Sequence, residues 1–254
     1  MAVVRRAVSY VLVVVGIAAV TMAASSDASL ATATSSTPIF EVASVQPAAG
    51  EVVGVGAPVV VTFTKTIVDR AAAERTIHIA SATNPAGRYV WLNQQVVQWK
   101  PDGFWPAHSR VTVVAGGAPT QWETGAAVLG VADISAHTFT VSIDDQVVRE
   151  MPASMGKPSR PTPVGSFSVL EKDRSVVMDS RTIGIPLNSP EGYRITAQYA
   201  ERITSGGVYV HSAPWSVDSQ GNANVSHGCI NLSPDNAAWY YDTVSVGDPV
   251  IVQP

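Results

Sequence analysis

This chain of 254 residues contains a single cysteine, Cys229. One cysteine excludes any disulfide within the chain, so no disulfide framework supports the fold. Charged side chains make up only 14% of the residues, and the net charge of −4 leaves no basic surplus of the kind that binds nucleic acid. The sequence also lacks a His-Glu-x-x-His pattern, and no Lys or Arg follows Arg202. We therefore expect no nucleic-acid partner, no cofactor and no metal.

The N-terminal segment has the features of an export signal. Residues 1–6 include two arginines, an almost uninterrupted apolar run spans 7–24, and Ser, Ala and Thr dominate as far as residue 37. This order is typical of a signal peptide. The apolar run is also close to the ~18–20 residues that cross a bilayer, so a retained anchor is the alternative. We predict a signal peptide or N-terminal anchor with linker over 1–36. The protein is then exported to the periplasm or cell wall, secreted or anchored to the outer face of the plasma membrane.

Residues 37–125 are predicted to form an immunoglobulin-like β-sandwich. Glycine and proline are plentiful, valine and threonine dominate, and strand-like runs recur about every ten residues between polar turns. These runs cover 58–63, 76–79, 88–91, 96–99 and 110–114, and the Ala- and charge-rich residues 69–75 indicate one helical turn. Trp91, Trp99, Trp105 and Trp122 are expected to pack in the core or between domains, with a glycan-stacking surface as the alternative.

A second β domain is predicted over 126–254. Small and turn-forming residues at 116–119 and 124–127 indicate the border near residue 126. Residues 133–148 then predict a hairpin in which Asp144 and Asp145 form the turn. The predicted fold class is therefore mainly β, with few short helices.

The lone cysteine lies in the run Ser226-His227-Gly228-Cys229-Ile230-Asn231, and His211 lies 18 residues upstream. A free thiol has a pKa near ~8.5 and needs a neighbouring base to act as a nucleophile. His211 is the candidate base if strand pairing brings 207–211 beside the cysteine. Gly228 permits a sharp turn, and the backbone N–H groups of His227, Gly228 and Cys229 are candidates for an oxyanion hole. By residue type, Asp218 or Asp235 remain possible partners that orient His211.

These residues resemble the YkuD-type L,D-transpeptidases of bacterial cell walls. The resemblance rests on Met155-Gly156-Lys157-Pro158, on Thr162-Pro163-Val164-Gly165-Ser166-Phe167, and on His211 followed after fourteen residues by Ser-His-Gly-Cys-x-Asn. It covers about residues 127–252. Together with the Ig-like domain it is closest to the short two-domain actinobacterial, mycobacterial-type enzymes, and it implies a YkuD-type β-sandwich or barrel-like catalytic domain.

The resemblance also implies roles for individual residues. Cys229 is the nucleophile and His211 the base, and the backbone carbonyl of Ser212 orients the imidazole ring. Gly228 and His227 belong to the catalytic loop. The expected substrate-binding residues are Tyr193, whose hydroxyl assists the oxyanion hole, Met178 and Trp215, which flank the substrate tunnel, and Ser212, Ser226 and Asn231. Structural roles are the alternatives for His227, Tyr193, Met178 and Trp215.

The implied reaction is a 3→3 crosslink between peptidoglycan stem peptides, with a tetrapeptide donor, a Cys thioester, release of D-Ala and a diaminopimelate amine as acceptor. Carbapenem β-lactams are the implied covalent inhibitors. The same chemistry leaves L,D-carboxypeptidase activity and wall-protein attachment as alternatives. A non-catalytic envelope-binding module fits the Ig-like half alone, and a zinc site of His211, His227 and Cys229 has no supporting spacing. A sortase-like enzyme would need an arginine after the nucleophile, and this chain has none there.

Overall fold

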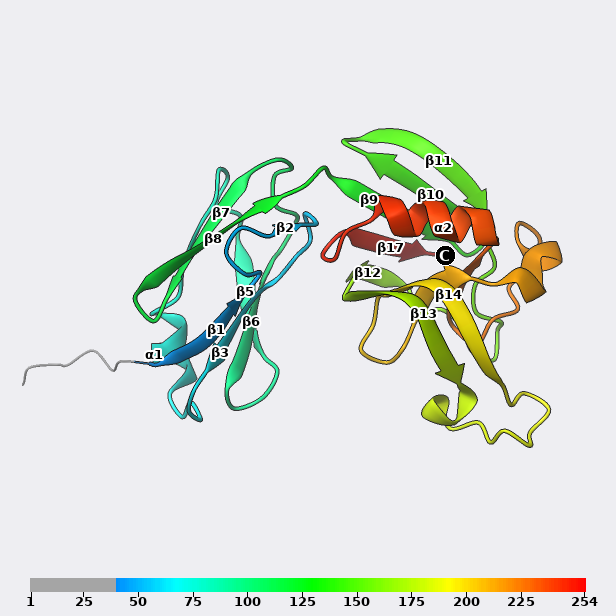
Figure 1. Cartoon of the computed structure of the whole chain (residues 1–254), viewed down its shortest axis with the longest axis horizontal. Helices are drawn as coiled ribbons and strands as arrows, with labels where there is room; N and C mark the ends of the chain where they lie inside the picture. Colours follow the sequence, from blue (N-terminus) through cyan, green and yellow to red (C-terminus); the bar gives the residue numbers. More distant parts are fainter. Residues whose placement is uncertain (1–39) are drawn as a thin grey trace, which may run out of the picture. The chain divides into compact units, whose positions relative to one another are not determined.

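The computed structural model describes residues 40–254, and most of the regular structure in this range is β-strand (Figure 1). The predicted signal peptide or anchor at 1–36 lies outside the described residues. Within 40–254, no helix is both long and apolar enough to cross a membrane. Within residues 40–254 the strands form four sheets, and none of these closes into a barrel. The predicted mainly β fold class is confirmed, while the domain border near residue 126 stays a prediction.

Residues 42–124, here called the N-terminal sandwich, form two four-stranded sheets in the orders β1-β3-β6-β5 and β2-β8-β7-β4. Inward-facing residues alternate with partly exposed ones, as in β3, where Val59, Val61 and Phe63 are buried. Residues of both sheets join one apolar core. The elements are β1 (Val42–Gln46), β2 (Val52–Val53), β3 (Val59–Phe63), α1 (Arg70–Glu74), β4 (His78–Ala80), β5 (Gly87–Trp91), β6 (Val96–Pro101), β7 (Arg110–Ala115) and β8 (Ala118–Thr124).

The sequence expectations for this region are confirmed in detail. The five predicted strand runs correspond to β3 to β7, and the predicted helical turn corresponds to α1, which Asp69 caps by accepting a hydrogen bond from the backbone N–H of Ala72 at 2.9 Å. Trp105 and Trp122 are buried with ring centroids 5.6 Å apart, edge to face. Trp91 stacks on Phe63 at 6.0 Å. The tryptophans therefore pack in the core, as expected.

Residues 128–253, here called the C-terminal region, form a five-stranded sheet in the order β11-β10-β9-β17-β12 and a four-stranded sheet in the order β13-β14-β15-β16. The last strand, β17, is inserted between β9 and β12 and runs parallel to β9. The strands are β9 (Val128–Asp133), β10 (Thr138–Ile143), β11 (Gln146–Pro152), β12 (Gly165–Ser168), β13 (Glu171–Asp179), β14 (Arg194–Arg202), β15 (Tyr209–Ser212), β16 (Ile230–Leu232) and β17 (Pro249–Gln253).

The predicted hairpin is the β10–β11 pair. Asp144 and Asp145 form its turn with φ of +47° and +66°, the left-handed conformation that a two-residue hairpin turn requires and that aspartate tolerates. The hairpin carries the buried Phe139, Val141 and Met151 into the core of the C-terminal region.

Helix α2 (Pro234–Thr243) joins the two sheets of the C-terminal region through that core. The Ser233 hydroxyl accepts a hydrogen bond from the backbone N–H of Asn236, and Pro234 occupies the first turn, so the helix start is well specified. The helix contacts β14 and β15, and Tyr240 meets Phe139 of β10 edge to face at 4.9 Å. Figure 1 shows α2 beside β9, β10 and β17.

Strands β15 and β16 bring the candidate catalytic residues together. They pair in parallel, so His211 lies opposite Asn231, and Cys229 is the residue immediately before β16. The expectation that strand pairing carries His211 to the cysteine-bearing segment is therefore confirmed.

Candidate active site

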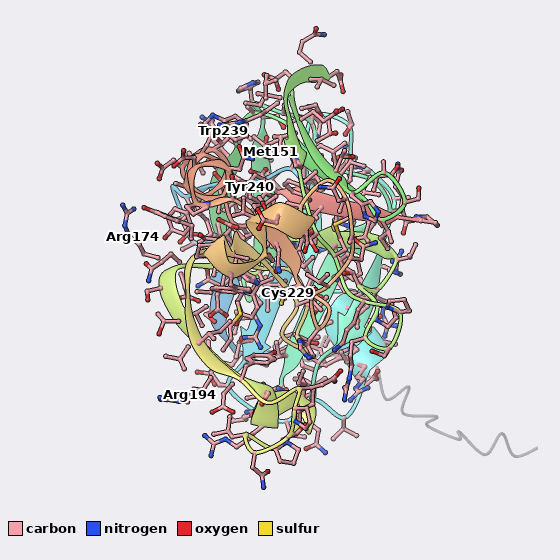
Figure 2. All side chains as sticks on the ribbon, turned by 90° about the vertical axis from the view of Figure 1, so that its right-hand side faces the viewer. Met151, Arg174, Arg194, Cys229, Trp239 and Tyr240 are labelled. Atoms are coloured by element: carbon pink, nitrogen blue, oxygen red, sulfur yellow. The ribbon has the colours of Figure 1, made fainter. Side chains whose placement is uncertain are left out.

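Cys229 opens onto a cavity of about 360 Å³ in the C-terminal region. Figure 2 shows Cys229 in the middle of the view, below Tyr240 and above Arg194. Eight of the ten predicted site residues line the cavity, and Gly228 and Ser212 do not. The predicted residues that line it are Met178, Tyr193, His211, Trp215, Ser226, His227, Cys229 and Asn231; Ile195, Ser216, Ser219 and Val225 complete the lining.

The imidazole of His211 is buried, and its Nδ1 lies 2.8 Å from the carbonyl oxygen of Ser212. A carbonyl only accepts, so Nδ1 carries the proton and Nε2 is the bare ring nitrogen that accepts. Asp218 and Asp235 are exposed, and within the described part of the chain neither orients this ring. The Ser212 carbonyl that the resemblance implied is therefore the orienting group.

Burial lowers the pKa of His211 to about 4, and the hydrogen bond to Ser212 only partly opposes this effect. The ring is neutral at pH 7, which is the state in which a histidine accepts a proton. A buried neutral imidazole with a fixed tautomer is well suited to act as a general base.

The thiol of Cys229 is partly exposed to the cavity, and it points toward the carbonyl oxygen of Gly207 at 3.9 Å. Desolvation raises the pKa of Cys229 to about 11. Among the described residues no hydrogen bond joins Cys229 to His211, and such contacts are often long before substrate binds. The resting site thus holds a neutral thiol and a neutral imidazole.

The loop that carries Cys229 is held by two hydroxyl side chains. Ser226 Oγ donates to the carbonyl of Cys229 at 2.7 Å and accepts from the backbone N–H of Gly228 at 3.0 Å. Thr162 Oγ1 donates to the carbonyl of Gly228 at 2.9 Å and accepts from the backbone N–H of Gly156 at 2.8 Å. Gly228 has a φ of +125°, which only glycine adopts without strain. The turn next to Cys229 therefore favours glycine at position 228.

These contacts bear on the expected roles of Gly228 and Ser226. The N–H of Gly228, one of the three donors expected for the oxyanion hole, donates to Ser226 Oγ in this structure. The hydroxyl of Ser226, expected to bind substrate, is likewise used within the loop. Gly228 and Ser226 both lie close to Cys229 in the sequence, and their hydrogen bonds stabilise the loop that carries it.

Asn231 fixes the loop from the other side. Its Nδ2 donates to Ser216 Oγ in the short helix η2 (Pro214–Ser219) at 3.1 Å, and its backbone N–H donates to the Ser154 carbonyl at 2.9 Å. The link holds η2, and with it the half-exposed Trp215, beside the cavity. The Trp215 ring lies 6.0 Å from the His211 ring.

Tyr193 and His227 form one wall of the cavity, with ring centroids 5.1 Å apart. Burial and then the nearby Cys229 raise the pKa of Tyr193, so its hydroxyl stays protonated and able to donate. The Nε2 of His227 lies 3.4 Å from Lys157 Nζ and 3.8 Å from Glu191 Oε2. Burial and then Lys157 lower the pKa of His227. Its ring therefore contacts the charged pair at the wall of the cavity, which favours a scaffolding role.

Sequence reasoning missed four residues that support the site. Lys157 and Thr162 lie in the two motifs that carried the resemblance, yet nothing local gave them a role. Glu191 lies two residues before Tyr193, and Ser216 follows Trp215. Each acts through a contact with a distant segment, which spacing does not reveal. In the described range no group of three or more His, Cys, Asp or Glu side chains is arranged to hold a metal ion.

Comparison with known proteins gives consistent matches. Residues 128–252 match the L,D-transpeptidase catalytic domain, YkuD, and residues 2–117 match a bacterial Ig domain. L,D-transpeptidase 1 of Mycobacterium tuberculosis is 59% identical over 248 residues, which cover 98% of this chain and 99% of that protein.

Two solved structures are similar over most of the chain. The L,D-transpeptidase LdtMt1 in complex with imipenem aligns with a TM-score of 0.82 and 63% identity, covering 85% of this chain and 100% of that one. L,D-transpeptidase 3 from Mycobacterium tuberculosis in complex with a faropenem-derived adduct aligns with a TM-score of 0.80 and 53% identity, covering 85% and 99%.

Proposed function

Because this chain belongs to the L,D-transpeptidase family and is an acyltransferase, we propose that it crosslinks the stem peptides of bacterial peptidoglycan through Cys229. The observation that carries this proposal is the cavity that contains both the thiol and His211, whose tautomer leaves Nε2 free to accept a proton. The donor is a tetrapeptide stem, and the acceptor is the side-chain amine of a diaminopimelate residue in a second stem.

In the first step, Sγ of Cys229 attacks the carbonyl carbon of the third donor residue while Nε2 of His211 takes the thiol proton. The tetrahedral intermediate collapses, and the bond to the terminal D-Ala breaks. The leaving amine takes the proton from His211, and a thioester remains on Cys229. His211 receives one proton from the thiol and gives one proton to the leaving amine. The step can therefore start from a neutral thiol and a neutral imidazole.

In the second step, the acceptor amine attacks the thioester carbon and His211 takes a proton from the amine. The carbon–sulfur bond breaks, and the sulfur recovers its proton from His211. The product is a 3→3 crosslink and the free thiol. If water replaces the amine, the product is a shortened stem, which is the carboxypeptidase alternative.

The negative oxygen of both intermediates needs hydrogen-bond donors. The backbone N–H groups of His227 and Cys229 and the hydroxyl of Tyr193 are the proposed donors, since the N–H of Gly228 already donates to Ser226. Removing one such donor costs about 100- to 1,000-fold in rate in well-studied hydrolases. Met178, Trp215 and Asn231 line the same cavity and are proposed to contact the peptide.

The strained ring of a carbapenem is proposed to acylate the same thiol. The family members solved with imipenem and with a faropenem-derived adduct support this reaction. We also propose export to the cell wall, with residues 1–36 as the signal or membrane anchor.

The proposed function is tested with purified tetrapeptide muropeptides and mass spectrometry. The expected product is a dimer whose mass is the sum of two monomers less one D-Ala, with the bond between two diaminopimelate residues. Cys229→Ala is the control and yields no dimer. Release of D-Ala without any dimer would overturn crosslinking in favour of hydrolysis.

A further inference from the structure

Tyr193 ends a closed loop, residues 180–193, here called the lid loop. The backbone N–H of Ser180 donates to the Tyr193 carbonyl at 2.9 Å, and the N–H of Tyr193 donates to Ser180 Oγ at 3.1 Å. Gly192 packs so closely that a Cβ there would lie 2.4 Å from the Pro186 carbonyl oxygen. The base of the lid loop is thus fixed where β13 ends and β14 begins, and Tyr193 is part of that base.

Lys157 connects this loop to the cysteine-bearing loop. Its backbone N–H donates to the Ser226 carbonyl at 3.0 Å, which ties it to the segment before Cys229. Its Nζ forms an ion pair with Glu191 of the lid loop and lies 3.4 Å from His227 Nε2. Hydrogen bonding to Lys157 lowers the pKa of Glu191, so the Glu191 carboxylate is ionised at pH 7. One side chain therefore spans from the nucleophile loop to the loop of Tyr193.

We infer that the Lys157–Glu191 ion pair is a latch that positions the Tyr193 hydroxyl at the oxyanion formed on Cys229. This inference rests on the proposed function, in which that hydroxyl stabilises the oxyanion. Neither Lys157 nor Glu191 lines the cavity, so both are positioning residues that act through Tyr193. The His227 ring, 5.1 Å from the Tyr193 ring, fills the space between the latch and the tyrosine.

The solvent exposure of Lys157 and Glu191 determines how much the loss of their ion pair should slow acylation. The Glu191 side chain is 46% exposed and that of Lys157 is 23% exposed. Exposed ion pairs are weak and are screened by salt, so the pair supplies only a small part of the energy that positions Tyr193. Losing it should slow acylation by about threefold, less than losing the tyrosine hydroxyl itself.

The first test measures the rate of acylation by imipenem in stopped-flow experiments. Glu191→Gln and Lys157→Met should each acylate about threefold more slowly than the natural sequence. Glu171→Gln is the matched control, because Glu171 is 49% exposed and pairs with Arg202 in the same region, and it should acylate at the unchanged rate. A slow Lys157→Met beside a normal Glu191→Gln would overturn the latch and indicate that Lys157 binds the ligand directly.

Two further measurements separate positioning from a general structural effect. Raising the ionic strength from ~0.01 M to ~1 M shortens the screening length from ~30 Å to ~3 Å, so the natural sequence should slow toward the rate of Glu191→Gln while the variant does not change. The exchanged pair Lys157→Glu with Glu191→Lys should recover most of the rate. A salt effect equal in all variants would contradict the inference.

The decisive measurement is a double-mutant cycle with Tyr193→Phe. If the latch acts through the hydroxyl, Glu191→Gln should have no further effect in the Tyr193→Phe background. Full additivity of the two losses would overturn the latch. A Tyr193→Phe variant that acylates at the unchanged rate would instead remove the proposed role of the hydroxyl. Acylation that persists in Cys229→Ala would overturn the proposed function itself, so the three failures are distinguishable.

Discussion

The N-terminal sandwich and the C-terminal region differ most in the polarity of what they bury. Among residues 40–254, eleven buried polar or charged side chains lie in the C-terminal region and one, Thr124, lies in the N-terminal sandwich. Burying a polar group without a hydrogen-bond partner costs about 1–3 kcal/mol, so most buried polar groups are expected to be hydrogen-bonded. Most of the eleven have partners around the cysteine loop, including Thr162, His211, Ser226 and Asn231.

The N-terminal sandwich, in contrast, buries almost only apolar side chains. Its core is aliphatic and aromatic, and four of the six tryptophans of the chain lie in it. Such a core is specified mainly by a pattern of apolar residues. We therefore expect substitutions in the sandwich to change stability and substitutions around Cys229 to change chemistry.

The largest effect is expected at the nucleophile and base. Cys229→Ala and His211→Asn should each reduce transfer to no more than a few per cent, because members of one nucleophile and base unit act together. Cys229→Ala should keep the unfolding temperature of the natural sequence, since the thiol is partly exposed and makes only a weak contact at 3.9 Å. The measurements are dimer formation and circular dichroism on heating. Substantial transfer by either variant would contradict the assigned roles.

The next largest effect is expected in the sandwich. Trp122→Ala removes a buried ring that packs on Trp105, and it should lower the free energy of unfolding by about 3–5 kcal/mol. Imipenem should still acylate the folded fraction at an unchanged rate. Val68→Ala is the control, since Val68 is 93% exposed and its loss should cost less than about 0.5 kcal/mol. Urea unfolding followed by fluorescence measures the free energy of unfolding of both variants. If fully folded Trp122→Ala were acylated more slowly, the expectation that sandwich substitutions change only stability would be wrong.

These expectations also show how far the sequence alone leads. Strand-like runs about ten residues apart predicted β3 to β7, and Asp144-Asp145 predicted the β10–β11 turn, because both signals are local. The motif around Cys229 and its spacing from His211 predicted two residues that line one cavity in the structure. The insertion of β17 between β9 and β12 has no local signal, since parallel pairing joins the two ends of the C-terminal region. The Lys157–Glu191 pair spans 34 positions and was missed for the same reason.

Glu201 is a further case that sequence reasoning could not find. It lies in β14, is fully buried, and neither carboxylate oxygen has a hydrogen-bond partner among the described residues. Desolvation raises the pKa of Glu201 to about 9, so the folded protein holds it protonated at pH 7. It contributes stability at low pH that is lost as pH rises from the unfolded value near 4.5 toward about 9.

The third prediction follows from this loss of stability as the pH rises. Between pH 6.5 and 9 the free energy of unfolding of the natural sequence should fall more steeply than that of Glu201→Gln, by up to ~1.4 kcal/mol per pH unit. His211 does not affect the slope in this window. Its pKa is lowered from 6.5 to about 4, so its titration raises the free energy of unfolding only between about pH 4 and pH 6.5. Glu171→Gln, whose carboxylate is exposed, is the control and should keep the natural slope. Urea unfolding at several pH values measures the slopes, and identical slopes would show that Glu201 is ionised in the folded state.

The smallest expected effect is the response of acylation to pH. The pKa of His211 is about 4 and that of Cys229 is about 11, so between these values the two residues together hold the same number of protons. A neutral thiol with a neutral imidazole and a thiolate with an imidazolium have equal composition, so the reactive fraction does not change with pH in this window. The rate of acylation by imipenem should therefore be nearly constant from pH 6 to pH 9 in stopped-flow measurements. In His211→Asn the residual rate should rise about tenfold per pH unit, because only free thiolate can then react. A tenfold rise per unit in the natural sequence would mean that Cys229 ionises without His211, and it would remove the reason for burying a polar pair in this region.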